Sequence, residues 1–192
     1  MSELPLIAVT DSASCPRPLA EQIERLAKLM ELRPQAVILR AKSLDKASYR
    51  TLALQAQQSC EAADIPLILH SDWQLTRELG ISMLHLPLAL LRQISEYERA
   101  YFTWLSTSVH SVGEAQEAQA LGATVLIAGH IYTTQCKAGL APRGLGFLQN
   151  VCSTVNLPVY AIGGISFDAS QHAELQANGA RGACVMSAYM RL

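Results

Sequence analysis

The chain has 192 residues, with 15 Lys and Arg against 16 Asp and Glu, which gives a formal net charge of -1. A chain of this length suits one domain around a single core, so we treat residues 1–192 as one domain. The balanced charge, without any basic stripe, argues against a nucleic-acid partner. No apolar run approaches the roughly twenty residues that a membrane span needs, so we expect no membrane partner either.

The cysteines and the amino terminus favour a reduced, cytoplasmic protein. The amino-terminal sequence MSELPLIAVTD has Glu3 where a secretion signal would have cationic residues. The cysteines are odd in number, widely scattered and without a Cys-x-x-Cys pair, which is typical of thiols that form no disulfide framework. The five are Cys15, Cys60, Cys136, Cys152 and Cys184.

Short apolar runs recur along the chain, each followed by turn residues. Continuous apolar runs are typical of parallel strands that are covered on both faces, whereas strands with one exposed face alternate. We therefore predict eight parallel strands. They lie at residues 6–10, 36–40, 66–70, 83–87, 103–108, 125–129, 159–164 and 182–187.

Helical periodicity fills the stretches between these runs. Ser111 with Glu114 predicts a capping box that opens a helix, and Gly122 is placed to end it. Two further helices each have one apolar face that could cover a strand. These faces comprise Tyr49, Leu52, Ala53, Ala56 and Cys60 in the first, and Leu145, Leu148, Cys152 and Val155 in the second.

Eight strand-helix units of about 24 residues each predict an α/β fold, a single-domain (β/α)8 TIM barrel. The rival, an open doubly wound sheet, would need a Gly-rich phosphate loop after its first strand, and VTDSASCP has none. Only residues 189–192 follow the eighth run, so the final helix is short or missing. A partner subunit or a loop should then cover the last strand, and we expect a homo-oligomer.

In such a barrel the site forms where the strands end. Arg40 and Lys42, two residues apart, face one side and either meet an anionic group or form a solvated pair. The pair Gly163-Gly164 would admit a phosphate to backbone N–H groups or simply make a tight turn. His85, between apolar neighbours, fits an interior hydrogen-bonded histidine better than a ligand. Polar residues also end the fifth and eighth runs, at Ser108 and Ser187.

His130 follows an apolar run and Gly129, so we expect its ring at the pocket rim in partly dry surroundings. An imidazole there could both accept and donate a proton. The alternative is a loop histidine that hydrogen-bonds the backbone, and position alone does not decide between them. No His, Asp or Glu pair has metal-ligand spacing, so we predict no metal and no cofactor.

Five segments, in this order and spacing, resemble the thiamine phosphate synthase superfamily, and most closely its TenI-type branch of thiazole tautomerases. They are VILRAK, STSVHSVGEAQEAQALGA, GHIYTTQCKAGLAPRG, VYAIGGIS and GACVMS. The stretch from 129 to 144 is the most specific, because the synthases usually have proline where this chain has His130. The resemblance implies a barrel that takes a thiazole carboxylate bearing a phosphoethyl arm.

The resemblance also implies roles for individual residues in thiamine biosynthesis. His130 corresponds to the proton-transfer histidine of the tautomerases, and Gly163, Gly164 and Ser187 to positions around the phosphate. Thr134 and Lys137 match polar residues of a loop over the substrate. Arg40 and Lys42 match the synthases' basic pair, which handles the pyrophosphate of the pyrimidine substrate.

Two other functions stay open beside the tautomerase, which is an isomerase. Thiamine phosphate synthase is a transferase that needs magnesium held by carboxylates, and this chain has His70-Ser71 where the synthases have Asn-Asp. It also has PLALL where they place a further acid, so Asp72 remains as a single carboxylate. A phosphate-binding protein without catalysis is the third possibility. We expect a metal-free tautomerase with His130 as general acid and base.

Overall fold

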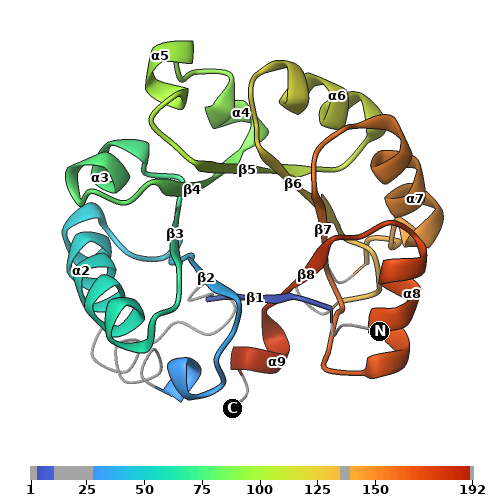
Figure 1. Ribbon diagram of the computed structural model, residues 1–192, viewed down its shortest axis with the longest axis horizontal. Helices are drawn as coiled ribbons and strands as arrows, with labels where there is room; N and C mark the ends of the chain where they lie inside the picture. Colours follow the sequence, from blue (N-terminus) through green and yellow to red (C-terminus); the bar gives the residue numbers. More distant parts are fainter. Residues whose placement is uncertain (1–3, 11–27, 135–138, 191–192) are drawn as a thin grey trace.

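The computed structural model describes residues 4–10, 28–134 and 139–190, in which eight parallel strands close into a barrel (Figure 1). Each strand pairs with its sequence neighbours, and β8 pairs with β1. The predicted TIM barrel is therefore confirmed, and both ends of every strand lie within two residues of the predicted ends. The strands are β1 (Leu6–Val9), β2 (Ala36–Leu39), β3 (Leu67–His70), β4 (Met83–Pro87), β5 (Trp104–Val109), β6 (Val125–Gly129), β7 (Val159–Ile162) and β8 (Gly182–Val185).

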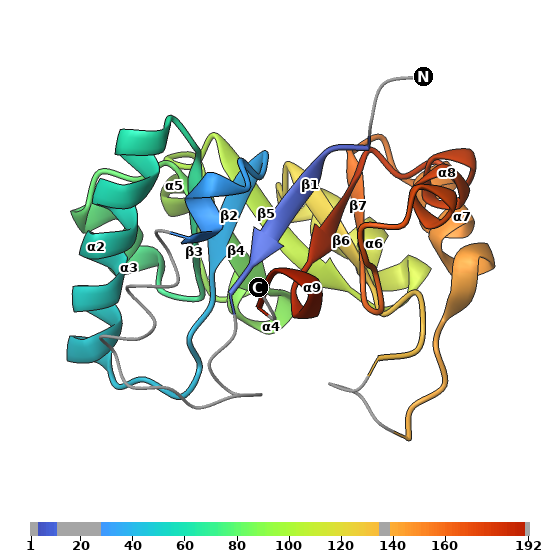
Figure 2. The same ribbon diagram turned by 90° about the horizontal axis from the view of Figure 1, so that it is seen from below.

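The helices form a ring outside the barrel, and the strands point toward the lower edge of the molecule in Figure 2. None of the helices in the described ranges is long and apolar enough to cross a membrane. The last helix has four residues, as the short end of the chain predicted. The helices are α2 (Lys46–Ala63), α3 (Trp73–Glu78), α4 (Leu88–Leu91), α5 (Glu96–Arg99), α6 (Val112–Ala120), α7 (Gly144–Thr154), α8 (Ala169–Ala177) and α9 (Ser187–Met190).

Alternation along the strands divides the core in two. One set of side chains fills the barrel interior, among them Ile38, Ile68 and Ile127, and the other set, with Leu39 and Leu69, packs against the helices. Because successive side chains in a strand point to opposite faces, residues two positions beyond an inner one also face inward. That rule directs Arg40 and His70 toward the mouth of the barrel.

The eighth strand is covered within the single chain. All four residues of β8 are buried, and Ala183 and Val185 belong to the outer cluster together with Leu175 of α8 and Tyr189 of α9. The expectation that a partner subunit or a loop must cover this strand is therefore wrong, because helices α8 and α9 of the same chain contribute to its burial. A homo-oligomer stays a prediction, but an uncovered eighth strand no longer supports it.

Helix α6 begins at the predicted residue, with a different cap. The Ser111 side chain accepts from the Glu114 N–H at 3.1 Å, and Gly122 follows the helix with φ of +84°. The Glu114 carboxylate, however, accepts from the N–H of His110 at 2.6 Å, one residue before the expected partner. The reciprocal capping box occurs instead between Ser95 and Glu98, at the start of α5.

Candidate active site

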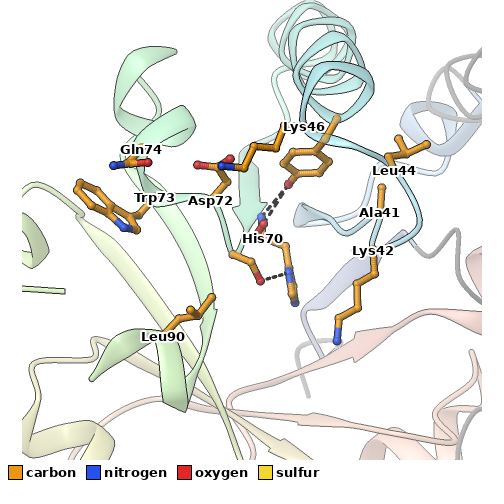
Figure 3. A pocket seen from close by; sticks show the side chains of 11 residues that line it. Ala41, Lys42, Leu44, Lys46, His70, Asp72, Trp73, Gln74 and Leu90 are labelled. Atoms are coloured by element: carbon orange, nitrogen blue, oxygen red, sulfur yellow. Dashed lines mark hydrogen bonds between the residues drawn. The ribbon is translucent and has the colours of Figure 1, made fainter. Parts of the chain in front are cut away.

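A pocket of about 360 Å³ lies beyond the ends of β2 and β3 (Figure 3). Strand ends, the first turn of α2, the start of α3 and α4 all contribute side chains to it. Lys42 and the His70 ring extend from adjacent strand ends into this space. The lining residues are Ala41, Lys42, Leu44, Lys46, Tyr49, His70, Ser71, Asp72, Trp73, Gln74 and Leu90.

Hydrogen bonds to the backbone fix the two strand ends. The hydroxyl of Tyr49 donates to the carbonyl of Leu39 at 2.9 Å and accepts from the N–H of His70 at 3.1 Å, so it bridges β2 and β3. Thr10 holds Arg40 in the same way: its Oγ1 accepts from the Arg40 N–H at 2.8 Å and donates to the Arg40 carbonyl at 2.9 Å. Burial raises the pKa of the Tyr49 hydroxyl, which stays protonated at neutral pH.

The turn after β3 places His70 and Ser71 at the pocket wall. Ser71 has φ of +70°, a left-handed conformation, and its N–H donates to the His85 carbonyl at 2.9 Å. The Ser71 Oγ lies 2.6 Å from Nδ1 of His70. The His70 ring in turn lies 5.3 Å from the His85 ring, between centroids. Through Ser71 and His70 this turn contacts His85, the buried histidine of β4.

His85 is an interior histidine, as predicted, and is 5% exposed. Its Nδ1 lies 2.9 Å from Ser106 Oγ and its Nε2 lies 3.0 Å from Ser108 Oγ. Burial above all, and then the positive charges of His70, Arg40 and Lys42, hold the pKa of His85 well below its usual range. Its ring is therefore neutral at pH 7, with one nitrogen donating and the other accepting.

The pocket carries more positive than negative charge. Lys42 and Lys46 are cationic, and Asp72 is the one carboxylate among the residues that line it. The Asp72 carboxylate also caps α3, because its Oδ1 accepts from the Leu75 N–H at 3.0 Å. Arg40 is close enough to affect His85 as well. An anionic ligand is therefore favoured there. Arg40 is not among the lining residues, so its predicted grouping with Lys42 around one anion stays a prediction.

His130 does not stand at the rim. The side chain is 3% exposed, outside the pocket lining, and neither ring nitrogen has a hydrogen-bond partner within the described ranges. Its backbone carbonyl accepts from the N–H of Arg143 at 3.0 Å, and Ile131 N–H donates to the Ile162 carbonyl at 2.9 Å. These bonds hold the segment after β6 against the end of β7, which buries the histidine that we expected to be partly solvated.

The glycine pair after β7 is packed against this same segment. A Cβ on Gly163 would lie 2.8 Å from Cα of His130, and one on Gly164 would lie 2.8 Å from Cβ of Tyr132. Both glycines have positive φ, +106° and +70°. Their lack of side chains is thus already required by the fold, whether or not a phosphate also approaches them.

The other predicted residues lie at several strand ends. Ser108 is in β5 against His85, Thr134 follows β6 and is half-buried, and Ser187 begins α9 directly after β8. Lys137 lies outside the described residues. Ser108, Thr134 and Ser187 are not among the residues that line the pocket at β2 and β3.

Magnesium does not fit the described side chains. No group of three or more His, Cys, Asp or Glu residues within the described ranges is placed to hold a metal ion. Mg²⁺ is held through carboxylates and phosphates in near-octahedral geometry. The pocket offers Asp72 alone, and Ala89 and Leu90 occupy the stretch where an acid was sought.

The fold and the site define a (β/α)8-barrel protein with a cationic pocket at the carboxyl ends of its strands. The chain belongs to the TMP-TENI family, described as thiamine monophosphate synthase, which matches residues 6–189. It is thus a member of an enzyme family that acts on small phosphate-containing compounds.

Named relatives and solved structures agree with the family. A thiamine-phosphate synthase of Listeria monocytogenes serotype 4b (strain CLIP80459) is 36% identical over 157 residues, which are 79% of this chain and 72% of the relative. One of Clostridium acetobutylicum is 30% identical over 135 residues, 68% and 62% of the two chains. The fold matches a thiamine phosphate pyrophosphorylase from Pyrococcus furiosus with a TM-score of 0.76 at 23% identity, over 96% and 86% of the chains.

The expected tautomerase function is wrong. Relatives at 30–37% identity are named thiamine-phosphate synthase, which is a transferase and not an isomerase. The sequence argument gave too much weight to a single position, His130, and to departures at the expected magnesium ligands. The basic pair and the overall similarity favour the synthases.

Sequence reasoning missed several residues of the pocket. Lys46, Tyr49 and Trp73 lie in the first turns of helices, where periodicity assigned Tyr49 to the core and gave the others no role. A signal did exist, because Lys46 lies four residues after Lys42 in RAKSLDK. The sequence does not show that Lys42 and Lys46 line one cavity, because this depends on the direction of the turn between β2 and α2.

Proposed function

We propose that this protein is a transferase of the thiamine-phosphate synthase type, which joins a pyrimidine to a thiazole phosphate and releases pyrophosphate. The observation that carries the proposal is the cationic pocket beyond β2 and β3, with Lys42, Lys46 and His70 on its wall and Arg40 beside it. The names of the 30–37% identical relatives support it. The cytoplasmic location that the cysteines favoured belongs to the same proposal.

The chemistry calls for stabilisation of a leaving anion. The bond between the methylene carbon of the pyrimidine and the pyrophosphate oxygen breaks, and the thiazole nitrogen forms a bond to that carbon with its lone pair. The nitrogen becomes cationic and pyrophosphate leaves with both electrons of the broken bond, so no proton need move. Positive charge fixed where the negative charge develops lowers the barrier. Lys42 and Lys46 supply that charge in this pocket.

The second substrate would bind across the ends of β5 to β8. Thr134, Ser187, the backbone after β7 and Lys137 remain the residues that we propose for the thiazole phosphate. Ser108 belongs to this group through its contact with His85, whose neutral ring fixes the direction of the serine hydroxyl. His130, whose side chain is buried and outside the pocket, has no proton-transfer role in this proposal.

Replacement of Lys42 tests the assignment. Lys42→Gln should lower the rate of thiamine phosphate formation on the order of 100-fold, as loss of one donor to a developing anion does elsewhere. Lys28→Gln is the matched control, because Lys28 is exposed and precedes β2, at the other end of the barrel. Product is measured by chromatography, with and without Mg²⁺. Equal rates for the two variants would contradict the role of the pocket, and binding of both substrates without turnover would indicate a binding protein instead.

A further inference from the structure

The pocket combines a surplus of cationic groups with a shortage of metal ligands. Two lysines and one histidine face a single carboxylate, and part of that carboxylate is engaged as the cap of α3. A divalent cation bound to pyrophosphate serves to offset its charge and to hold its oxygens in place. Here the side chains that line the pocket provide positive charge at that location, and among the described residues they offer one carboxylate, Asp72, as a metal ligand.

We propose, on the basis of the function above, that this chain binds a pyrophosphate group directly, without a divalent cation. Lys42 and Lys46 donate hydrogen bonds to its oxygens and offset its charge, and the His70 ring lies beside them in the pocket. They come from the end of β2, the first turn of α2 and the end of β3, so they surround the ligand from three elements. Ser71 holds the His70 ring in place through the 2.6 Å contact between Oγ and Nδ1.

The surroundings strengthen this arrangement. Leu44, Trp73 and Leu90 form apolar parts of the wall, and Tyr49 fixes the backbone of His70. Lys42 and Lys46 are themselves exposed, so they reach the pocket from the solvent side while the apolar residues form its floor and wall. The volume of about 360 Å³ is many times that of one water molecule, which occupies roughly 30 Å³, and leaves room for two linked phosphates.

Calorimetry with inorganic pyrophosphate tests the proposal without any turnover. Titration of the full chain in EDTA should show binding, and an excess of Mg²⁺ should weaken it, since the magnesium complex carries less negative charge. Lys46→Gln should weaken binding in EDTA about tenfold, which corresponds to roughly 1.4 kcal/mol, while Lys28→Gln should not. Binding that occurs only with Mg²⁺, or an unchanged affinity in Lys46→Gln, would overturn the proposal.

A carboxylate added to the pocket should reverse the metal response. Ser71→Asp places a second acid beside Asp72, and aspartate is among the residues that adopt positive φ most readily. In this variant binding in EDTA should weaken at least tenfold, and Mg²⁺ should now strengthen it. A thermal melt establishes that the variant is folded. A folded variant that binds as tightly as the wild type in EDTA would contradict the direct contact.

The two proposals fail in different ways. If pyrophosphate binds in EDTA but no thiamine phosphate forms under any condition, the transferase function is wrong and direct binding stands. If thiamine phosphate forms only with Mg²⁺ and pyrophosphate binding also requires it, the transferase stands and direct binding is wrong.

Discussion

His85 connects the pocket at β3 with the polar interior of the barrel. Its ring contacts two serine hydroxyls, and the Ser106 hydroxyl also donates to the Leu84 carbonyl at 3.4 Å. With that proton engaged, Ser106 accepts from Nδ1–H of His85, and Nε2 accepts from the Ser108 hydroxyl. In this arrangement the Ser108 oxygen donates its proton to His85 and keeps its lone pairs as acceptors, which suits a ligand group that donates a hydrogen bond.

The depressed pKa of His85 predicts a pH dependence of stability. The unfolded chain takes up a proton near pH 6.5, the ordinary value for histidine, whereas the folded chain resists it. The free energy of unfolding should therefore fall as the pH drops below about 6.5, with a contribution from this residue of at most about 1.4 kcal/mol per pH unit. Above pH 7 the contribution is constant.

Denaturant unfolding between pH 5 and 8 measures this effect. His85→Gln keeps a donor and an acceptor but does not titrate, so the variant should show a shallower fall below pH 6.5 than the wild type. Identical slopes for the two proteins would show that His85 is not held neutral in the folded state.

For single residues, the sequence predicted which charged side chains belong to the site better than it predicted how buried a side chain is. Arg40 and Lys42 were paired by their spacing, and His85 was placed in the interior by its apolar neighbours. The burial of His130 was not predictable from its neighbours in sequence. Its backbone carbonyl accepts a hydrogen bond from the N–H of Arg143, which lies 13 residues further along the chain. Lys46 was missed because the direction of the turn before α2 is set by tertiary structure.

Among the elements, the segment after β6 packs closely against the end of β7. This contact depends on Gly163, where a Cβ would overlap His130 and where φ is +106°. Strands β6 and β7 end here side by side. Because Gly163 has no side chain, the segment after β6 can pass close to the end of β7.

Gly163→Ala should lower the free energy of unfolding by about 3 kcal/mol, from overpacking together with the unfavourable φ. Gly146→Ala is the matched control. Gly146 lies in α7 with open space around its Cα, so alanine should raise stability by about 0.5–1 kcal/mol. Chemical denaturation of both variants gives the comparison. Equal stability of Gly163→Ala and the wild type would show that the contact is not as close as described.

Element positions followed from the sequence more reliably than their caps. The buried face of α2 comprises the five residues that its periodicity predicted. In α7, by contrast, Val151 is fully buried and was not predicted, while Leu145 and Cys152 are only partly buried. The capping partner of Glu114 was shifted by one residue, because two adjacent N–H groups compete for one carboxylate. Periodicity thus identifies a face, and local geometry decides which groups pair.

The described part of the molecule closes into a barrel because eight strands repeat at regular spacing, with helices between them. That repetition is visible in the sequence, which is why the architecture was predictable. What covers β8 was not, since it depends on how α8 and the four residues of α9 pack. An oligomer remains a prediction for light scattering, and a monomer at micromolar concentration would contradict it.

The proposed function calls for two anion sites at one end of the barrel, one for each substrate. The direct test is to incubate the purified protein with the pyrimidine pyrophosphate and the thiazole phosphate, and to quantify thiamine phosphate and released pyrophosphate by mass spectrometry. The proposal predicts both products in equal amounts, at rates that fall sharply in Lys42→Gln. No product above the uncatalysed background, with or without Mg²⁺, would contradict it.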